Sequence, residues 1–178
     1  MVKRERSRTY PGVNLEKSIE NITKIRKELG SGVLDKNAIA VGLGYNSFTG
    51  DIGTKISAMV QFGFLEKNKN GYKLSKQSEQ ITHSKDQNEY SQAVLKAFYT
   101  PDLYADLIEI YKADGRIPKQ LSNILYREHR ITSTASEHAA RLFIESATFA
   151  KVIDFDSNYI EIFADSDNDS SEASVYVV

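Results

Sequence analysis

Apolar side chains recur every three or four residues along the first part of the chain, which places them on one face of an amphipathic helix. The first row consists of Leu15, Ile19, Ile22, Ile25 and Leu29. Asn14 can accept hydrogen bonds from the free N–H groups of a first helical turn, and Gly30 lies where helices commonly end. We therefore predict a helix that starts after Asn14 and ends before Gly30.

Two shorter helices are predicted next. Asp35 is suited to cap the first of them, and Gly44 to end it. After the polar turn 46–50, a third helix covers about residues 49–61, and Gly63 breaks it. The side chains predicted to point inward are Ile39, Ala40 and Leu43 in one helix and Ile52, Ile56, Met59 and Val60 in the other.

A small hairpin is predicted directly after the third helix. Residues 64–67 and 72–75 are short strand-like runs, and Asn68-Lys69-Asn70-Gly71 separates them. An Asn-Gly pair accepts positive φ at both central positions of a tight turn, which favours a hairpin here. Ser75 is predicted to cap a linker helix that reaches about His83. Three helices followed by a hairpin is the plan of a winged helix-turn-helix domain.

The second part of the chain shows a similar but weaker pattern. Three apolar rows and a longer fourth helix, from about 133 to 152, are predicted, with capping-box registers in 132–137 and a strand over 159–163. Pro118 suits the first turn of the third of these helices. The rows are Ala93, Leu95, Phe98 and Tyr99; Leu103, Leu107, Ile110 and Tyr111; Leu121, Ile124 and Leu125; and Ala139, Leu142, Phe143, Ser146, Phe149 and Ala150.

These elements predict a mainly α-helical chain with small β-hairpins (α+β), built from two tandem winged-helix-like domains. The expected organisation is a flexible basic arm over 1–13, a winged helix over 14–85, a second helical or degenerate winged-helix domain over 86–164, and a disordered acidic tail over 165–178.

Charge divides along the chain although the net charge is only −1. Residues 1–85 carry 15 Lys or Arg and 8 Asp or Glu, whereas residues 86–178 carry 8 and 16. Such asymmetry indicates different partners for the two halves; mutual attraction of two solvated surfaces is the alternative. The chain has no Cys, which excludes disulfides, thiolate metal sites and a cysteine nucleophile. No run approaches the ~20 apolar residues of a membrane span, and we expect a cytoplasmic protein.

Several motifs resemble a bacterial and archaeal family that is known mainly as a domain of unknown function with winged-helix character. They are Tyr10-Pro11-Gly12-Val13, then Gly44-Tyr45-Asn46-Ser47 with Gly50, Lys55 and Ser57-Ala58, then Phe62-Gly63-Phe64-Leu65-Glu66, Tyr99-Thr100-Pro101 and Phe143-Ile144-Glu145-Ser146-Ala147-Thr148-Phe149-Ala150. The resemblance covers roughly residues 10–154. It implies a winged-helix fold and a bacterial, archaeal or phage setting, and it brings no catalytic residues.

A winged helix places its third helix in the major groove of DNA, which makes residues 49–61 the predicted reading helix. Free N–H groups at its start can hold a phosphate, and basic hairpin and arm residues can contact the backbone or minor groove. The predicted DNA-binding residues are Arg4, Arg6 and Arg8 of the arm, together with Lys3; Asn46, Ser47 and Thr49 at the helix start; Thr54 and Lys55, with Ser57 and Ala58, on its outward side; and Lys67, Lys69, Asn70 and Lys73 of the hairpin.

An interaction adaptor is the alternative to a DNA-binding regulator or DNA-associated accessory factor. The reading helix has no Arg, the commonest reader of guanine, and Asp51 would repel a phosphate. An adaptor would bind a protein through the acidic C-terminal half. Winged-helix proteins commonly pair on symmetric DNA, so a homodimer also stays open.

We predict no metal, cofactor or enzymatic activity. His83, His129 and His138 offer no i, i+4 pair for zinc, and no sequence motif brings a nucleophile next to a base.

Overall fold

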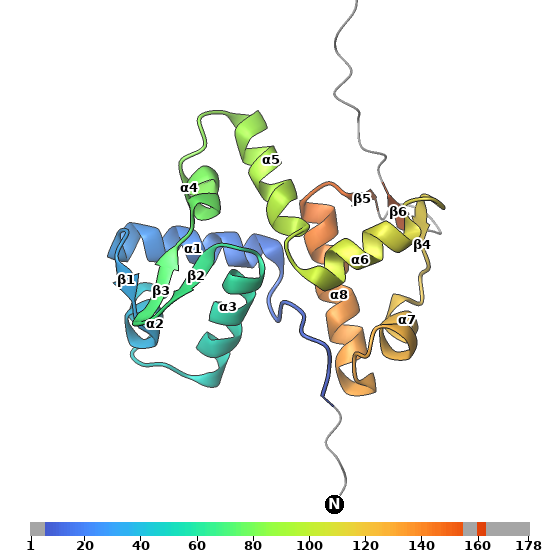
Figure 1. The fold of residues 1–178 in the computed structure, drawn as a ribbon, viewed down its shortest axis with the longest axis horizontal. Coiled ribbons are helices and arrows are strands. Elements are labelled where there is room, and N and C mark those ends of the chain that lie inside the picture. Colours follow the sequence, from blue (N-terminus) through green and yellow to red (C-terminus); the bar gives the residue numbers. More distant parts are fainter. Residues whose placement is uncertain (1–5, 155–159, 163–178) are drawn as a thin grey trace, which may run out of the picture.

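The computed structural model describes residues 6–154 and 160–162. This part of the chain is mainly α-helical and contains two small antiparallel sheets (Figure 1). The helices are α1 (Leu15–Leu29), α2 (Lys36–Gly42), α3 (Gly50–Gln61), α4 (Lys76–Thr82), α5 (Gln87–Phe98), α6 (Asp102–Tyr111), α7 (Leu121–Glu128) and α8 (Ser133–Phe149). The strands are β1 (Val33–Leu34), β2 (Leu65–Asn68), β3 (Gly71–Leu74), β4 (Arg116–Ile117), β5 (Ile153–Asp154) and β6 (Ile160–Ile162).

Capping side chains start three of the helices as predicted. The side-chain oxygens of Asn14 and Asp35 each accept a hydrogen bond from a backbone N–H three residues on, at 2.8 Å, and Ser75 does so at 3.1 Å. Such a cap contributes about 1 kcal/mol by satisfying an N–H group that the helix leaves free. The apolar row of α1 from Leu15 to Ile25 is buried, which confirms the predicted face.

The same order of elements occurs twice in the structure. We call residues 15–74 (α1-β1-α2-α3-β2-β3) the N-terminal unit and residues 102–162 (α6-β4-α7-α8-β5-β6) the C-terminal unit. In each unit the last strand lies in the middle of its sheet, in the orders β1-β3-β2 and β4-β6-β5. The register also matches, because Leu65 faces Leu74 as Ile153 faces Ile162. Helices α4 and α5 connect the two units (Figure 1).

The two units share one hydrophobic core. Five aromatic rings from Phe62, Phe64, Phe98, Tyr104 and Phe143 gather where the units meet. The Tyr104 ring lies at its centre, with centroid distances of 5.1 Å to Phe143, 5.4 Å to Phe98 and 6.0 Å to Phe62. Aromatic pairs at this distance are attractive beyond their burial. Burial raises the pKa of the Tyr104 hydroxyl, so this group stays protonated inside the core.

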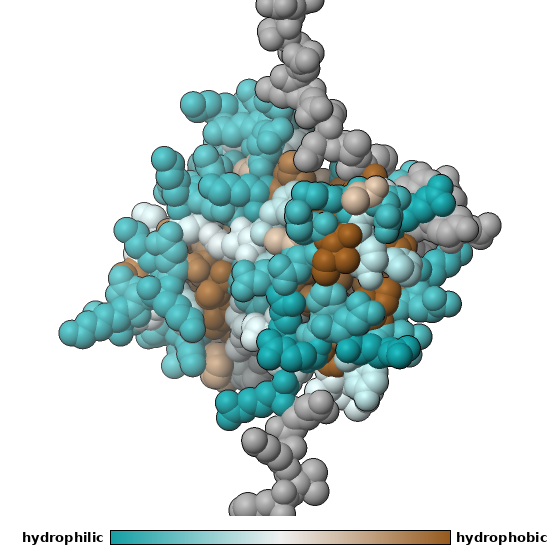
Figure 2. Space-filling view, turned by 45° about the vertical axis from the view of Figure 1, so that its right-hand side comes forward, coloured by the Kyte–Doolittle hydropathy of each residue, from teal (hydrophilic) through white to brown (hydrophobic). Residues whose placement is uncertain are grey.

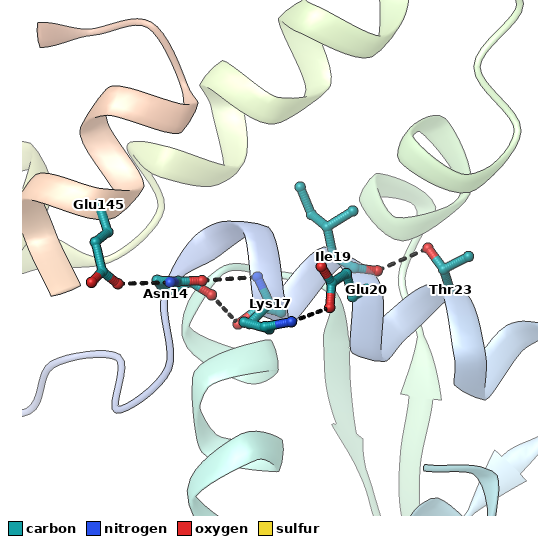
Figure 3. Close-up of polar contacts among 7 residues, drawn as sticks. Asn14, Lys17, Ile19, Glu20, Thr23 and Glu145 are labelled. Carbon is teal, nitrogen blue, oxygen red and sulfur yellow. Dashed lines mark hydrogen bonds and ion pairs between the residues drawn. The ribbon is translucent and has the colours of Figure 1, made fainter. Parts of the chain in front are cut away.

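A polar contact joins the start of α1 to α8. The Leu15 N–H donates to the buried Ser146 Oγ at 3.0 Å, and the Asn14 side-chain amide donates to Glu145 at 2.7 Å. Figure 3 shows Asn14 between Glu145 and Lys17: its amide nitrogen donates to Glu145 while its oxygen caps the Lys17 N–H. The free N–H groups of α1 are thus satisfied partly by the other unit.

The hairpin turn lies one position earlier than predicted. Asn68 pairs with Gly71, so Lys69 and Asn70 occupy the turn and the predicted Asn70-Gly71 centre is wrong. The glycine has a different role. Gly71 has φ 147, and a Cβ there would overlap the carbonyl oxygen of Leu34, so only glycine allows β1 to pair this closely.

Other local predictions were also wrong. Helix α7 begins at Leu121, so Pro118 precedes it and follows β4 instead of occupying its first turn. The cap residue Thr132 makes no side-chain capping bond to α8. Ile110, expected to point inward, is 52% exposed. The strands β1, β4 and β5 were not predicted, because two residues are too few to show an alternating pattern.

Candidate nucleic-acid interface

The hairpin β2–β3 presents the predicted lysines to solvent. Lys67, Lys69 and Lys73 are exposed, as is Asn70, and among the described residues none of the three ammonium groups has an ion-pair partner. Ammonium groups on a short hairpin that make no internal ion pair are suited to contact phosphates, because no such pair has to break when a phosphate binds.

An open hollow of about 560 Å³ lies beside the turn of the hairpin. It brings the start of α2 next to the hairpin, with Lys36 and Lys67 among its lining residues and Asp35 as its carboxylate. The Lys36 Nζ lies 5.2 Å from the centre of the Phe48 ring, a cation–π distance. Sequence reasoning did not name Lys36 as a binding residue, although its position beside the Asp35 cap placed it at the start of α2.

The loop between α2 and α3 is exposed and partly apolar. Asn46 and Ser47 are exposed there, together with Tyr45 and Phe48, whose exposed fractions are 42% and 38%. Thr49 caps α3 by accepting a hydrogen bond from a backbone N–H at 3.4 Å. The residues predicted at the helix start therefore lie together on one surface.

Lys55 is less available than predicted. Its ammonium forms an ion pair with Asp51 and donates to the Tyr45 hydroxyl at 3.0 Å, with the Tyr45 ring centre 4.9 Å away. Partial burial disfavours the charged form, but the bonds to Asp51 and Tyr45 outweigh it, and the pKa of Lys55 is raised. Lys55 stays charged at neutral pH, and its charge is offset by Asp51.

One side of α3 faces the N-terminal segment. The Thr54 hydroxyl donates to Gly50 O at 3.2 Å, and a Cβ on Gly12 would come within 2.5 Å of the Thr54 methyl carbon. About two turns further along, Gln61 donates to the carbonyl of Tyr10 at 3.2 Å. Ala58 lies between these two contacts on the same helix face and is fully buried, so its predicted outward position is wrong.

The N-terminal segment is fixed to the C-terminal unit over its described residues. The Arg8 N–H donates to Arg130 O at 2.9 Å, and its guanidinium forms an ion pair with Asp106 at 2.5 Å. Ser7 Oγ accepts from the Thr132 N–H at 3.3 Å. These bonds hold Arg8 in place, although residues 1–13 were predicted to form a flexible arm. Arg6 is exposed, and Lys3 and Arg4 lie outside the described residues.

The predicted residues thus lie in two places. The loop 46–49 and the hairpin both lie beside the start of α2 on the N-terminal unit. In contrast, Arg6 and Arg8 lie in the N-terminal segment beside Asp106 of α6. The surface facing the viewer in Figure 2 is mostly hydrophilic, with hydrophobic residues visible as patches bordered by hydrophilic ones.

Helix α8 holds the place of α3 in the C-terminal unit but has a different surface. Arg141, exposed on this helix, bonds His138 at 2.8 Å and approaches Glu145 to 4.0 Å. Its one arginine is therefore paired within the helix, which contains no lysine.

Within residues 6–154 and 160–162, no three His, Asp or Glu side chains gather to hold a metal ion. None of the helices described there has the length and apolar character that crossing a membrane requires. Comparisons with protein-family models, with curated proteins and with solved structures found no match to this chain. The family resemblance of the motifs therefore stays a prediction.

Proposed function

We propose that the N-terminal unit is a winged helix that binds duplex DNA, and that the C-terminal unit is a second, winged-helix-like domain. The observation that carries this is the element order α1-β1-α2-α3-β2-β3, with β3 central and three lysines on the β2–β3 hairpin that form no ion pair with any described residue. In such a domain α3 is the reading helix and the hairpin is the wing.

Most of the affinity is expected from the DNA backbone. The wing supplies three cations and the loop 46–49 supplies hydroxyl, amide and backbone donors for phosphates. On α3 the exposed polar side chains are Asp51, Thr54 and Ser57, and the single lysine is paired with Asp51. Direct reading of bases is therefore weak, and binding depends strongly on salt. This is the profile of a cytoplasmic prokaryotic transcription regulator or DNA-associated accessory factor, without cofactor or catalytic step.

Fluorescence anisotropy of the full chain with random-sequence duplex DNA tests the proposal. Binding at about 50 mM salt should weaken strongly at about 200 mM salt. Replacing Lys67, Lys69 and Lys73 by Ala should weaken it at least tenfold at low salt. The matched control replaces the exposed Lys24, Lys27 and Lys96, which lie on helices α1 and α5, and should retain most of the affinity. Equal losses in both variants, or no binding by the wild type, would reject the wing.

A protein-interaction adaptor is the second candidate function. The exposed apolar side chains of Val41 in α2 and of Tyr45 and Phe48 in the loop before α3 favour it, as does the internal pairing of Lys55. An adaptor would show no salt-dependent DNA binding at low salt. It would lose its protein partner when these three side chains are replaced by Ser.

A further inference from the structure

A hollow of about 830 Å³ lies where the N-terminal segment meets both units. Its wall combines residues from the N-terminal segment, the end of α3, the start of α6 and the loop before α8. The charged residues among them are Arg6, Arg8, Asp102, Asp106 and Arg130. The volume falls in the range of about 300–1,000 Å³ that is usual for small-molecule sites.

The charges in this hollow are only partly paired. Arg8 is bound to Asp106. In contrast, the guanidinium groups of Arg6 and Arg130 have no hydrogen-bond or ion-pair partner within the described ranges, and the Asp102 carboxylate has none either. Two free guanidinium groups and one free carboxylate thus face a common space, which suits a ligand with both an anionic group and hydrogen-bond donors.

The backbone of Arg130 is unusual for its residue type. It follows the end of α7 with φ 56, whereas Gly44 follows the end of α2, the equivalent helix of the N-terminal unit, with φ 89. Glycine takes positive φ without strain, and arginine does not. Backbone strain at a residue that lines a hollow is typical of ligand-binding sites.

We propose that this hollow binds a phosphorylated small molecule of about nucleotide size. The planar forks of Arg6 and Arg130 would hold phosphate oxygens in bidentate pairs, and Asp102 would accept hydrogen bonds from hydroxyl or amino groups of the same ligand. The proposal does not depend on DNA binding by the wing, because the wing lysines contribute nothing to this wall.

Isothermal titration calorimetry of the full chain with inorganic pyrophosphate, and separately with adenosine diphosphate, tests the site. Saturable binding of one ligand per chain is expected, tighter for the nucleotide. The Arg130→Gly variant should lose at least tenfold in affinity without loss of thermal stability, since glycine suits this backbone. Arg6→Gln should lose a similar amount of affinity. The control Arg127→Gln makes the same charge change at an exposed position of α7 and should bind as the wild type does.

The absence of saturable binding by the wild type would overturn the proposal, as would unchanged binding by Arg130→Gly and Arg6→Gln. A phosphate of DNA is the other source of the same chemistry. If Arg130→Gly weakens duplex DNA binding as much as the wing variant does, and neither probe binds, then the small-molecule site is rejected in favour of a DNA contact. The wing variant, with Lys67, Lys69 and Lys73 replaced by Ala, should still bind pyrophosphate and adenosine diphosphate. This result would distinguish the small-molecule site from DNA binding by the wing.

Discussion

Asp51 and Lys55 form an ion pair one helical turn apart on α3, and the Lys55 ammonium also donates to the Tyr45 hydroxyl. Lys55 is the only basic residue of α3. The reading helix of the proposed interface therefore presents a nearly neutral surface, and the cations near it that pair with no described residue belong to the wing.

Replacing Asp51 by Asn should tighten DNA binding. The change removes a carboxylate that repels phosphates and releases Lys55 to contact them, which we expect to improve the affinity by roughly threefold, in keeping with the modest value of an exposed ion pair. Fluorescence anisotropy at low salt measures this. Asp114→Asn, an exposed change in the C-terminal unit, is the control and should leave affinity nearly unchanged. Equal or weaker binding by Asp51→Asn would place DNA away from α3.

Removing the Ser146 hydroxyl should destabilise the whole chain. Ser146 is fully buried, and Ser146→Ala deprives the Leu15 N–H of its partner at the junction of the units, which should lower the free energy of unfolding by about 1–3 kcal/mol. Urea unfolding measures the change. The exposed Ser91→Ala should shift it by less than about 0.5 kcal/mol.

Because the core is shared, circular dichroism and tyrosine fluorescence should give one coincident unfolding transition; two separate transitions would show that the units unfold independently.

His129 should make stability depend on pH. Burial and the nearby Arg8 guanidinium lower its pKa, outweighing the opposite effects of Glu128 and Asp106. The unfolded chain takes up the proton near the ordinary pKa of about 6.5, and the folded chain does so only at lower pH. The free energy of unfolding should therefore fall as pH drops from about 6.5 toward the folded pKa, and be independent of this group above 6.5.

Urea unfolding at several pH values, compared between the wild type and His129→Leu, isolates this contribution. The difference in the free energy of unfolding between the two proteins should change below pH 6.5 in favour of the variant. A difference that stays constant across this range would show that His129 keeps its ordinary pKa.

Local signals in the sequence were enough for most helices. Asn14, Asp35 and Ser75 could be recognised as caps because a cap depends on a few neighbouring residues, and the apolar rows of α1 and α3 follow from helical spacing alone. The two-residue strands could not be predicted, since β1 and β4 exist only through pairing with residues far along the chain.

The candidate site was predictable to a similar extent. The wing lysines are exposed on a local hairpin, so the sequence could place them. The position of Arg8 could not be predicted, because its ion-pair partner Asp106 lies in α6 and no sequence feature near Arg8 indicates this pair. The burial of Ala58 could not be predicted either, because the segment beside this face of α3 precedes α1 and is distant in the sequence.

A titration of the 15N-labelled chain with duplex DNA, followed by amide chemical shifts, tests the central claim most directly. The wing proposal predicts fast, salt-sensitive shifts confined to the loop 46–49, the first turns of α3 and residues 65–74, with α8 unchanged. Shifts confined to α8 and the C-terminal unit, or none at low salt, would contradict it.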